Sequence, residues 1–422
     1  MTGNDKQHYK YKSKAELMVL SILENRVHNI RLQIHQPDGT VCRVGENGPL
    51  VNWHLHTHKT LPSILKHPEV NLGSSYVRGE WDVDTRLLAD LVQALVSKRA
   101  RPRWLPTRWL QNLRTRLPHS HKPDPLPHWQ DTSARVSRLC LGDMLFHGCS
   151  LYNEPGMSLE QAQRTRCRSL LARLQVQPGQ QILDLNAGWG TLALFLAEQA
   201  GVKVTAMVQT LEQLRYARSE ARRRGLETST HFRLGSFHQC RGRFDRILGT
   251  GFIEHFSEST YPILFRHFDK LLQDDGFVWL QVTGRSKDTA LSNRWYQKQL
   301  PYPHSLPLLS NLTSALQTSM LRPLYMEDQT GQRLQDLDNQ ARRFYRHRSA
   351  ICQHSGERHT RHWEFRLASQ TTAMRWGQLS QYELLLGNTR SVCPSFDQTL
   401  QAPADSLPAD ITNQIPGLAR PT

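Results

Sequence analysis

Between residues 180 and 284 the sequence alternates between apolar strands and amphipathic helices, and this pattern constrains the fold more than any other feature. The segments "QQILDLN", "VKVTAMV", "FDRILGTGF" and "FVWLQVTG" are typical of buried strands. Helical segments such as "TLALFLAEQA" and "YPILFRHFDKLLQ" separate them, and a turn is expected at "DDG" before the last strand. This alternation predicts an α/β fold with a doubly wound, mostly parallel sheet.

A glycine-bearing turn follows the first of these strands. In "DLNAGWG", residues 184–190, backbone amides at the start of the next helix can approach a ligand at the carboxyl end of the sheet. The pattern does not fit the dinucleotide fingerprint G-x-G-x-x-G. It fits D-x-G-x-G-x-G, the loop of S-adenosylmethionine-dependent methyltransferases, with Asn186 in place of one glycine. Asn adopts left-handed backbone angles more readily than other side chains, so a working loop is favoured over a structural turn without a ligand.

Residues 15–95 predict a smaller α+β region. "NIRLQIHQPDGTVCRVG" alternates like a hairpin around Asp38-Gly39, and "DVDTRLLADLVQALVSK" predicts an amphipathic helix capped by Asp84. The histidines of "WHLHTHK" alternate as on one face of a strand. Because no cysteine or carboxylate cluster accompanies them, a solvated strand face is favoured over a metal site, and we expect no metal.

The chain of 422 residues carries a formal net charge of +16, which favours anionic partners. Basic residues concentrate between 98 and 122, where arginines alternate with Trp104, Trp109 and several leucines, and no Asp or Glu occurs. This composition is typical of an element that lies among the headgroups of an anionic phospholipid membrane. A solvated basic linker is the alternative. No nucleic-acid-binding signature is present, so we expect no nucleic acid as a partner.

Three features bear on the compartment. The seven cysteines form no CxxC pair, the N-terminus lacks an apolar segment followed by a cleavage site, and no apolar run is long enough to span a membrane. We therefore expect a cytoplasmic protein that is peripheral on the inner membrane face.

Several segments together resemble the cyclopropane-fatty-acyl-phospholipid synthase family, which includes the mycolic acid methyltransferases. They are "SSYVRGEWDVDTRLLADLV", "FHGCSLYNEPGMSLEQAQRTR", "DLNAGWG", "FDRILGTGFIEHF" and "YPILFRHFDKLLQDDGFVWLQVTG". The resemblance extends from about residue 30 to 390, and Trp189 inside the loop is specific to this family. It implies a class I methyltransferase-like, Rossmann-like sheet with a smaller α+β N-terminal domain.

The resemblance implies methyl transfer from S-adenosylmethionine to the cis double bond of unsaturated acyl chains of membrane phospholipids. In the family, a bicarbonate ion takes the proton that the product loses. Carried over by position, the catalytic residues are Cys149, Glu254 and Gln281. Gln281 replaces a His of the family, and Leu337 replaces a Tyr. The residues implied to bind the cofactor are His147, Gly148, Asp184, Asn186, Gly188, Trp189, Gly190, Gln209, Gln213 and Phe237.

The changed residues leave three interpretations open: a synthase with tolerated changes, a methyltransferase with altered chemistry, and a catalytically impaired paralogue that binds lipids or regulates. A nucleic-acid methyltransferase is a further alternative. We predict an N-terminal lipid-associated domain (1–98), a basic Trp/Arg/Pro linker (99–129), a methyltransferase domain (130–395) and a flexible tail (396–422). The oligomeric state stays open, with a homodimer as one alternative.

Overall fold

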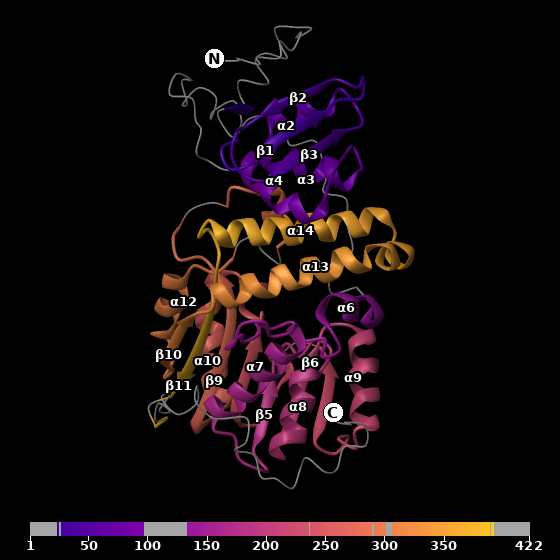
Figure 1. The fold of residues 1–422 in the computed structure, drawn as a ribbon. Coiled ribbons are helices and arrows are strands. Elements are labelled where there is room, and N and C mark those ends of the chain that lie inside the picture. The colour runs from indigo at the N-terminus through magenta and orange to yellow at the C-terminus, as the bar shows by residue number, and fades with distance from the viewer. Residues whose placement is uncertain are drawn as a thin grey trace.

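The computed structural model describes residues 23–24, 27–96, 133–235, 237–288, 291–300, 306–388 and 390–391. A small sheet lies at one end of the molecule and a large sheet at the other, and two long helices run between them (Figure 1). The basic Trp/Arg stretch and the C-terminal tail lie outside the described residues, so the predictions for them stay predictions. Within the described part, no helix combines the length and the apolar character needed to cross a membrane.

The large sheet has seven strands in the order β10-β11-β9-β8-β5-β6-β7. The five strands from β9 to β7 pair in parallel, whereas β11 and β10 continue the sheet in antiparallel orientation. The predicted doubly wound, mostly parallel sheet is therefore confirmed. The strands are β5 (Gln181–Asp184), β6 (Lys203–Val208), β7 (Thr230–Leu234), β8 (Phe244–Thr250), β9 (Leu272–Gly284), β10 (Arg322–Asp328) and β11 (Ser380–Gly387).

Helices cover both faces of this sheet. Successive side chains of a strand point to opposite faces, so neighbouring residues enter different cores. Ile182 and Leu248 pack in one core with α7, α8 and α9, whereas Leu183 and Ile247 pack in the other with α10 and α12. The helices are α7 (Leu159–Leu174), α8 (Thr191–Ala200), α9 (Leu211–Arg223), α10 (Tyr261–Leu271) and α12 (Leu309–Leu316).

Local capping signals place the ends of two of these helices. Ser158 and Gln161 form the predicted capping box, in which each side chain bonds the backbone of the other residue at the start of α7. Gly201 adopts the left-handed region at φ +61° and ends α8, as predicted. These two helices flank the strand β5, whose carboxyl end carries the glycine-bearing loop.

The turn predicted at residues 274–276 is wrong. Strand β9 already begins at Leu272, which pairs with Phe244 of β8, and it runs without a break to Gly284. The register of this pairing shifts between Phe244 and Arg246, so the expected turn residues form an irregularity within the strand. Early pairing with β8 therefore overrides the local turn signal.

The small sheet has the order β2-β1-β3-β4. Its first two strands form the predicted hairpin, and Gly39 in the turn has a left-handed backbone at φ +82°. Asp84 caps a single turn that leads into α4, because its side chain accepts a hydrogen bond from the Arg86 N–H. The elements are β1 (Arg31–His35), β2 (Val41–Val44), β3 (Leu50–Leu55), α2 (Thr60–Lys66), α3 (Pro68–Val77), β4 (Trp81–Val83) and α4 (Leu88–Val96).

The alternating histidines lie on the exposed side of this sheet. His54 stacks on His35 with ring centroids 4.3 Å apart, and His56 bonds Asp82 at 2.7 Å. His58 is exposed beyond the end of β3. In the described ranges, no group of three or more His, Cys, Asp or Glu side chains is arranged to hold a metal ion.

Helices α13 (Thr330–Ser355) and α14 (Glu357–Arg375) form a hairpin that joins the two sheets (Figure 1). Phe344 and Phe365 of this hairpin pack in the same core as Trp53 and Trp81 of the small sheet. Helices α6 (Ala134–Leu141) and α11 (Arg294–Gln297) add residues to this core. The small sheet therefore buries its apolar face against helices from the C-terminal half of the chain.

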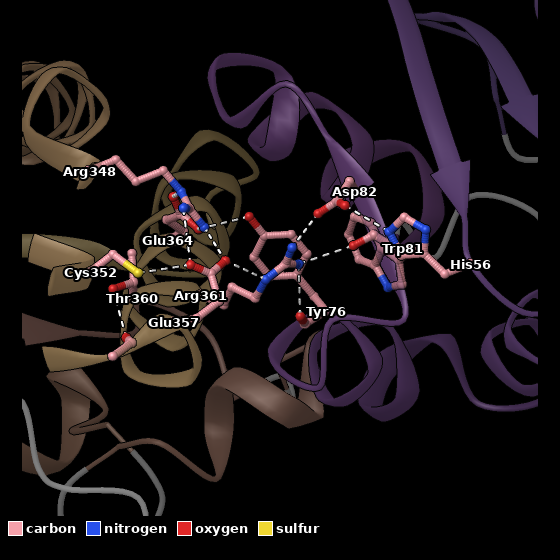
Figure 2. A network of polar contacts seen from close by, with 11 residues as sticks. His56, Tyr76, Trp81, Asp82, Arg348, Cys352, Glu357, Thr360, Arg361 and Glu364 are labelled. Carbon is pink, nitrogen blue, oxygen red and sulfur yellow. Dashed lines mark hydrogen bonds and ion pairs between the residues drawn. The ribbon is translucent and has the colours of Figure 1, made fainter.

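A polar network fixes the small sheet on α14 (Figure 2). The Arg361 guanidinium donates hydrogen bonds to the carbonyl oxygens of Tyr76 and Trp81, at 3.2 and 3.1 Å, and it also pairs with Asp82. The Tyr76 hydroxyl donates to Glu364 at 2.9 Å. Burial raises the pKa of Tyr76 far above its ordinary value, so the hydroxyl remains a donor.

We expect Arg361→Met to lower the free energy of unfolding by about 2–4 kcal/mol, because the Tyr76 and Trp81 carbonyl oxygens and the Asp82 carboxylate lose a charged donor. Urea denaturation measures this change. Arg346→Met is the matched control, since Arg346 is an exposed arginine of α13, and it should cost less than about 0.5 kcal/mol. Equal losses in the two variants would contradict the role of Arg361.

Candidate active site

A cavity of about 170 Å³ lies at the carboxyl ends of the central parallel strands, beside α13 and α14. Open α/β sheets bind their ligands at this edge. Ten of the thirteen predicted site residues line it: His147, Gly148, Cys149, Asp184, Asn186, Gly188, Gln209, Gln213, Glu254 and Gln281. The three that do not are Trp189, Gly190 and Phe237.

The loop after β5 is shaped by its two glycines. Gly188 and Gly190 have left-handed backbones, at φ +55° and +83°. A side chain at Gly190 would lie 2.7 Å from Phe232, so this glycine serves close packing beneath the loop. A side chain at Gly188 would come within 3.5 Å of His147, another residue of the cavity wall. Gly188 therefore keeps the cavity open, whereas Gly190 lets the helix pack on the sheet.

Asn186 lines the cavity, but the reason predicted for it is wrong. Its backbone does not adopt the left-handed region. Its side-chain amide instead donates a hydrogen bond to the carbonyl oxygen of Thr250 at 2.8 Å, and Gln209 donates to its Oδ1 at 3.4 Å. Asn186 thus links the loops that follow β5, β6 and β8 through its side-chain hydrogen bonds, which a glycine could not form.

One half of the cavity carries groups suited to a polar ligand. Burial raises the pKa of Asp184 to about 7, and its carboxyl accepts a hydrogen bond from the Asn186 N–H at 3.2 Å. Gln209 follows β6, where related sheets place an acid for a ribose hydroxyl. Gln213 is buried and its Oε1 accepts the Gln209 N–H at 3.0 Å, which orients that segment. These groups could bind hydroxyl and amine groups of a nucleoside.

Trp189 and Phe237 are buried among aromatic side chains and do not line the cavity. The Trp189 ring is 2% exposed and meets the ring of Tyr216 edge-on, with centroids 5.4 Å apart. Phe237 packs against Phe252 and Phe256 in an aromatic cluster. Their predicted contact with a cofactor stays a prediction.

The three predicted catalytic residues line the same cavity. Gln281 Oε1 accepts the backbone N–H of Cys149 at 2.6 Å, and Glu254 Oε1 accepts the backbone N–H of Thr283 at 2.6 Å. The remaining polar atoms, Gln281 Nε2 and Glu254 Oε2, are buried and have no hydrogen-bond partner among the described residues. A bound group would therefore find one donor and one acceptor here.

Burial sets the protonation of these groups. It raises the pKa of Glu254 to about 7, and it raises the pKa of the Cys149 thiol far above its ordinary range. Burial, aided by the charges of Arg333 and Arg366, lowers the pKa of His147 to about 3. At neutral pH the thiol and the imidazole are uncharged, and Glu254 is the group of the three that can exchange a proton.

A fully buried arginine holds the Cys149 segment in place. Arg166 Nε donates to the Cys149 carbonyl oxygen at 3.0 Å, while its other nitrogens donate to Glu383 and Gln329, each at 2.6 Å. Glu383 lies on β11 and also pairs with Arg173 at 2.8 Å. Arg166 and its hydrogen bonds therefore connect the Cys149 segment of the cavity wall to β11 at the antiparallel end of the sheet.

The residues of the cavity wall that come from the C-terminal half of the chain were not predicted from the sequence. Leu337, expected at the bicarbonate position, is fully buried in the core shared with the small sheet and does not line the cavity. Arg333, Arg366 and Tyr296 line it instead. Helices α13 and α14 are rich in charged residues, and nothing in their spacing distinguishes the arginines that face the cavity from those that face water.

The residues present offer only part of the bicarbonate site that the resemblance implies. The Cys149 thiol donates toward the carbonyl oxygens of Ser150 and Gln329, at 3.6 and 3.9 Å. The backbone N–H groups of Cys149 and Thr283 already donate to Gln281 and Glu254, and Leu337 has no polar atom to offer. The implied set of contacts is therefore not reproduced.

The buried Glu254 predicts a pH dependence of stability. Its folded-state pKa of about 7 lies above the ordinary value, so its contribution to stability is fully present below that ordinary value and is lost as pH rises through 7. We expect the free energy of unfolding of the wild type, relative to Glu254→Gln, to fall by about 3 kcal/mol between pH 4.5 and 8. Asp184 is present in both proteins and cancels. A constant difference across this range, measured by denaturant titration, would contradict the assignment.

Comparison with known proteins places this chain in a family. A family model described as mycolic acid cyclopropane synthetase matches residues 122–384. The cyclopropane-fatty-acyl-phospholipid synthase of Escherichia coli (strain K12) is 26% identical over 245 residues, and the match covers 56% of this chain and 62% of that synthase. Tuberculostearic acid methyltransferase UfaA1 of Mycobacterium tuberculosis is 25% identical over 397 residues, which cover 84% of this chain and 82% of the relative.

A solved structure shows the same fold. The mycolic acid cyclopropane synthase CmaA1, complexed with SAH and CTAB, superposes with a TM-score of 0.56 at 19% identity, and the match covers 60% of this chain and 94% of that one. The large sheet and its helices thus form a class I methyltransferase fold, as the resemblance implied. With more than half of its residues matched by the family model, the chain belongs to the mycolic acid cyclopropane synthetase family.

Proposed function

We propose that the protein is an S-adenosylmethionine-dependent methyltransferase that modifies the cis double bond of unsaturated acyl chains of membrane phospholipids. One observation carries the proposal: a single cavity joins the loop after β5 to the pair formed by Glu254 and Gln281. Family membership supports the cofactor and the lipid class of the acceptor. Two relatives support this acceptor by their names: the cyclopropane-fatty-acyl-phospholipid synthase of Escherichia coli and the tuberculostearic acid methyltransferase of Mycobacterium tuberculosis.

The loop half of the cavity fits the cofactor. Gly188 leaves room that a side chain would fill, and Asp184, Gln209 and Gln213 would hold the polar groups of the nucleoside and the amino acid. S-adenosylmethionine supplies an electrophilic methyl group on a sulfonium. The complex of CmaA1 with SAH, in a protein of the same fold, supports this use of the cavity.

The other half offers an apolar and aromatic wall for an acyl chain. Leu300, Leu306 and Leu367 line it together with the rings of Tyr296 and Trp363. Holding the double bond in line with the methyl group supplies much of the rate, because an alkene is a poor nucleophile. The aromatic faces would stabilise the positive charge that develops on the chain after transfer.

A second cavity offers a path by which the chain could reach this wall. It has a volume of about 410 Å³ and lies between α4 and the helix hairpin, with Phe344 and Ala368 among its apolar residues. Leu367 lines both cavities, so the two lie close together at this residue. We include in the proposal that the acyl chain enters past Leu367.

Glu254 is our candidate for the proton acceptor. Methyl transfer leaves a carbocation on the acyl chain, and loss of a proton from the chain restores neutrality. Glu254 Oε2 is buried, has no partner among the described residues, and belongs to a carboxyl whose pKa of about 7 suits a base at neutral pH. Because the contacts implied for bicarbonate are not reproduced, we assign this proton transfer to Glu254 alone.

We also propose that the protein works at the surface of an anionic membrane. The formal net charge of +16 would draw it to acidic phospholipids, and the acceptor chains reside there. Peripheral binding on the inner membrane face would then suffice for access to the substrate. Retention of the wild type on vesicles that contain anionic lipid, with release at high salt, is the expected behaviour.

Cofactor binding separates this proposal from the alternative of a catalytically impaired, lipid-binding paralogue. We expect calorimetry to detect S-adenosylmethionine binding to the wild type, and Gly188→Val to weaken it at least tenfold by filling the cavity. Gly225→Val is the matched control, because Gly225 is also left-handed (φ +68°) but has open space around it and does not line the cavity. Undetectable binding to the wild type at millimolar cofactor would favour the paralogue.

The proposed roles of Glu254 and Cys149 predict that substitutions at these two residues lower turnover by different amounts. Glu254→Gln keeps the shape and should lower turnover at least tenfold, or about 1.4 kcal/mol of barrier, because the proton acceptor is lost. Cys149→Ala retains the backbone N–H that Gln281 accepts, so we expect a smaller loss. The measurement is transfer of a labelled methyl group to vesicles of unsaturated phospholipid, with saturated vesicles as the blank. Full activity of Glu254→Gln would contradict the proposed base.

A further inference from the structure

Two arginines face the same cavity from the helix hairpin. Arg333 lies in the first turn of α13 and Arg366 lies in the middle of α14, and both line the cavity. Both lie close enough to His147 for their charges to lower its pKa, so they share one region of the wall. The proposed methyl transfer assigns no role to either of them.

Arg333 has little compensation for its charge. Its Nη1 is buried and has no hydrogen-bond partner in the described part of the chain. Arg333 Nη1 lies 3.9 Å from Asp336 Oδ2, and that oxygen accepts the Ser150 N–H at 2.8 Å. The other oxygen of Asp336 accepts the Tyr152 hydroxyl at 2.9 Å. Asp336 is therefore engaged with the residues next to Cys149, whereas Arg333 lines the cavity and its Nη1 keeps an unused donor.

Arg366 adds a second positive charge to the same region. Burial lowers the pKa of its guanidinium and the nearby charge of Arg333 lowers it further, whereas Tyr296 acts in the opposite direction. The carboxyl side chains of the cavity wall are Asp184 and Glu254, and burial raises the pKa of each to about 7. At neutral pH these two carboxyls carry less than their full charge, so the wall has an excess of positive charge.

A further donor lies in the same cavity. Gln281 is 1% exposed, and its Nε2 has no hydrogen-bond partner among the described residues. A buried donor without a partner is unfavourable, and so are two like charges that line one cavity. Both penalties disappear when an acceptor with negative charge binds. A guanidinium presents its N–H groups in a planar fork that matches carboxylate and phosphate oxygens.

We propose that Arg333 and Arg366 form an oxyanion-binding site in the cavity, completed by the amide of Gln281. The ligand is a carboxylate or a phosphate, either borne by the acceptor lipid or free in solution. An anion here would lie in the same cavity as the reacting carbon and would select acceptors with a nearby acidic group. The inference goes beyond the proposed function, because anion binding requires neither the cofactor nor methyl transfer.

Thermal unfolding without cofactor tests the site. The probes are phosphate and acetate as free anions, and oleate against oleyl alcohol as a matched pair that differs in charge. We expect an anion to raise the melting temperature of the wild type, and Arg366→Met and Arg333→Gln to raise the Kd of that anion at least tenfold. Arg346→Met, which changes an exposed arginine of α13, should bind as the wild type does.

The stability of the variants without any anion gives a second test, because replacing a purely structural arginine would lower stability. Without any anion, Arg366→Met should be as stable as the wild type or more stable, because one of two like charges is removed from the cavity wall. Stabilisation by the small anions supports a free ligand, and stabilisation by oleate but not by oleyl alcohol or small anions supports an acceptor-borne group. No shift with any anion, or a shift that persists in both variants, overturns the site. Either of these two results would leave the methyl-transfer proposal standing, because the experiment contains no cofactor and does not measure methyl transfer.

Discussion

The arrangement of the cavity depends on one buried arginine. Arg166 is fully buried and reaches three segments at once: the Cys149 backbone, Glu383 of β11, and Gln329 just before α13. Removing a charge from water costs several kcal/mol, and this is offset only when every donor finds a well-placed acceptor. Because the acceptors come from distant parts of the chain, the guanidinium fixes the Cys149 segment relative to the sheet and the hairpin. The catalytic wall can exist only in that arrangement.

The Cys149 segment held in this way presents two uncharged side chains to the cavity, next to one carboxyl that can exchange a proton. His147 and Cys149 are neutral because of burial, whereas Glu254 titrates at a pKa of about 7. Gln281, in place of the histidine of the family, caps the Cys149 N–H and leaves an amide donor free in the cavity. In the proposed function, the single carboxyl of Glu254 takes the place of the ion-binding groups that the resemblance implies.

The sheet and the loop could be predicted from sequence because their signals are local. Apolar runs separated by helices predict a parallel sheet, and the glycine spacing places the cavity at its carboxyl edge. The reason given for Asn186 was wrong, because its side chain bonds Thr250 across a 64-residue separation that no local pattern contains. Arg333 and Arg366 were missed for a similar reason. In a helix rich in charged residues, the arginines that face a cavity differ from exposed ones only through the tertiary packing.

The central claim is that one cavity brings a sulfonium methyl group, an acyl double bond and Glu254 together. Mass spectrometry of membrane lipids tests it most directly, in cells that lack any related activity and express either the wild type or Glu254→Gln. The account predicts that unsaturated phospholipid chains gain the mass of one methylene with the wild type and not with the variant. Unchanged lipids with a wild-type protein that binds S-adenosylmethionine would contradict it.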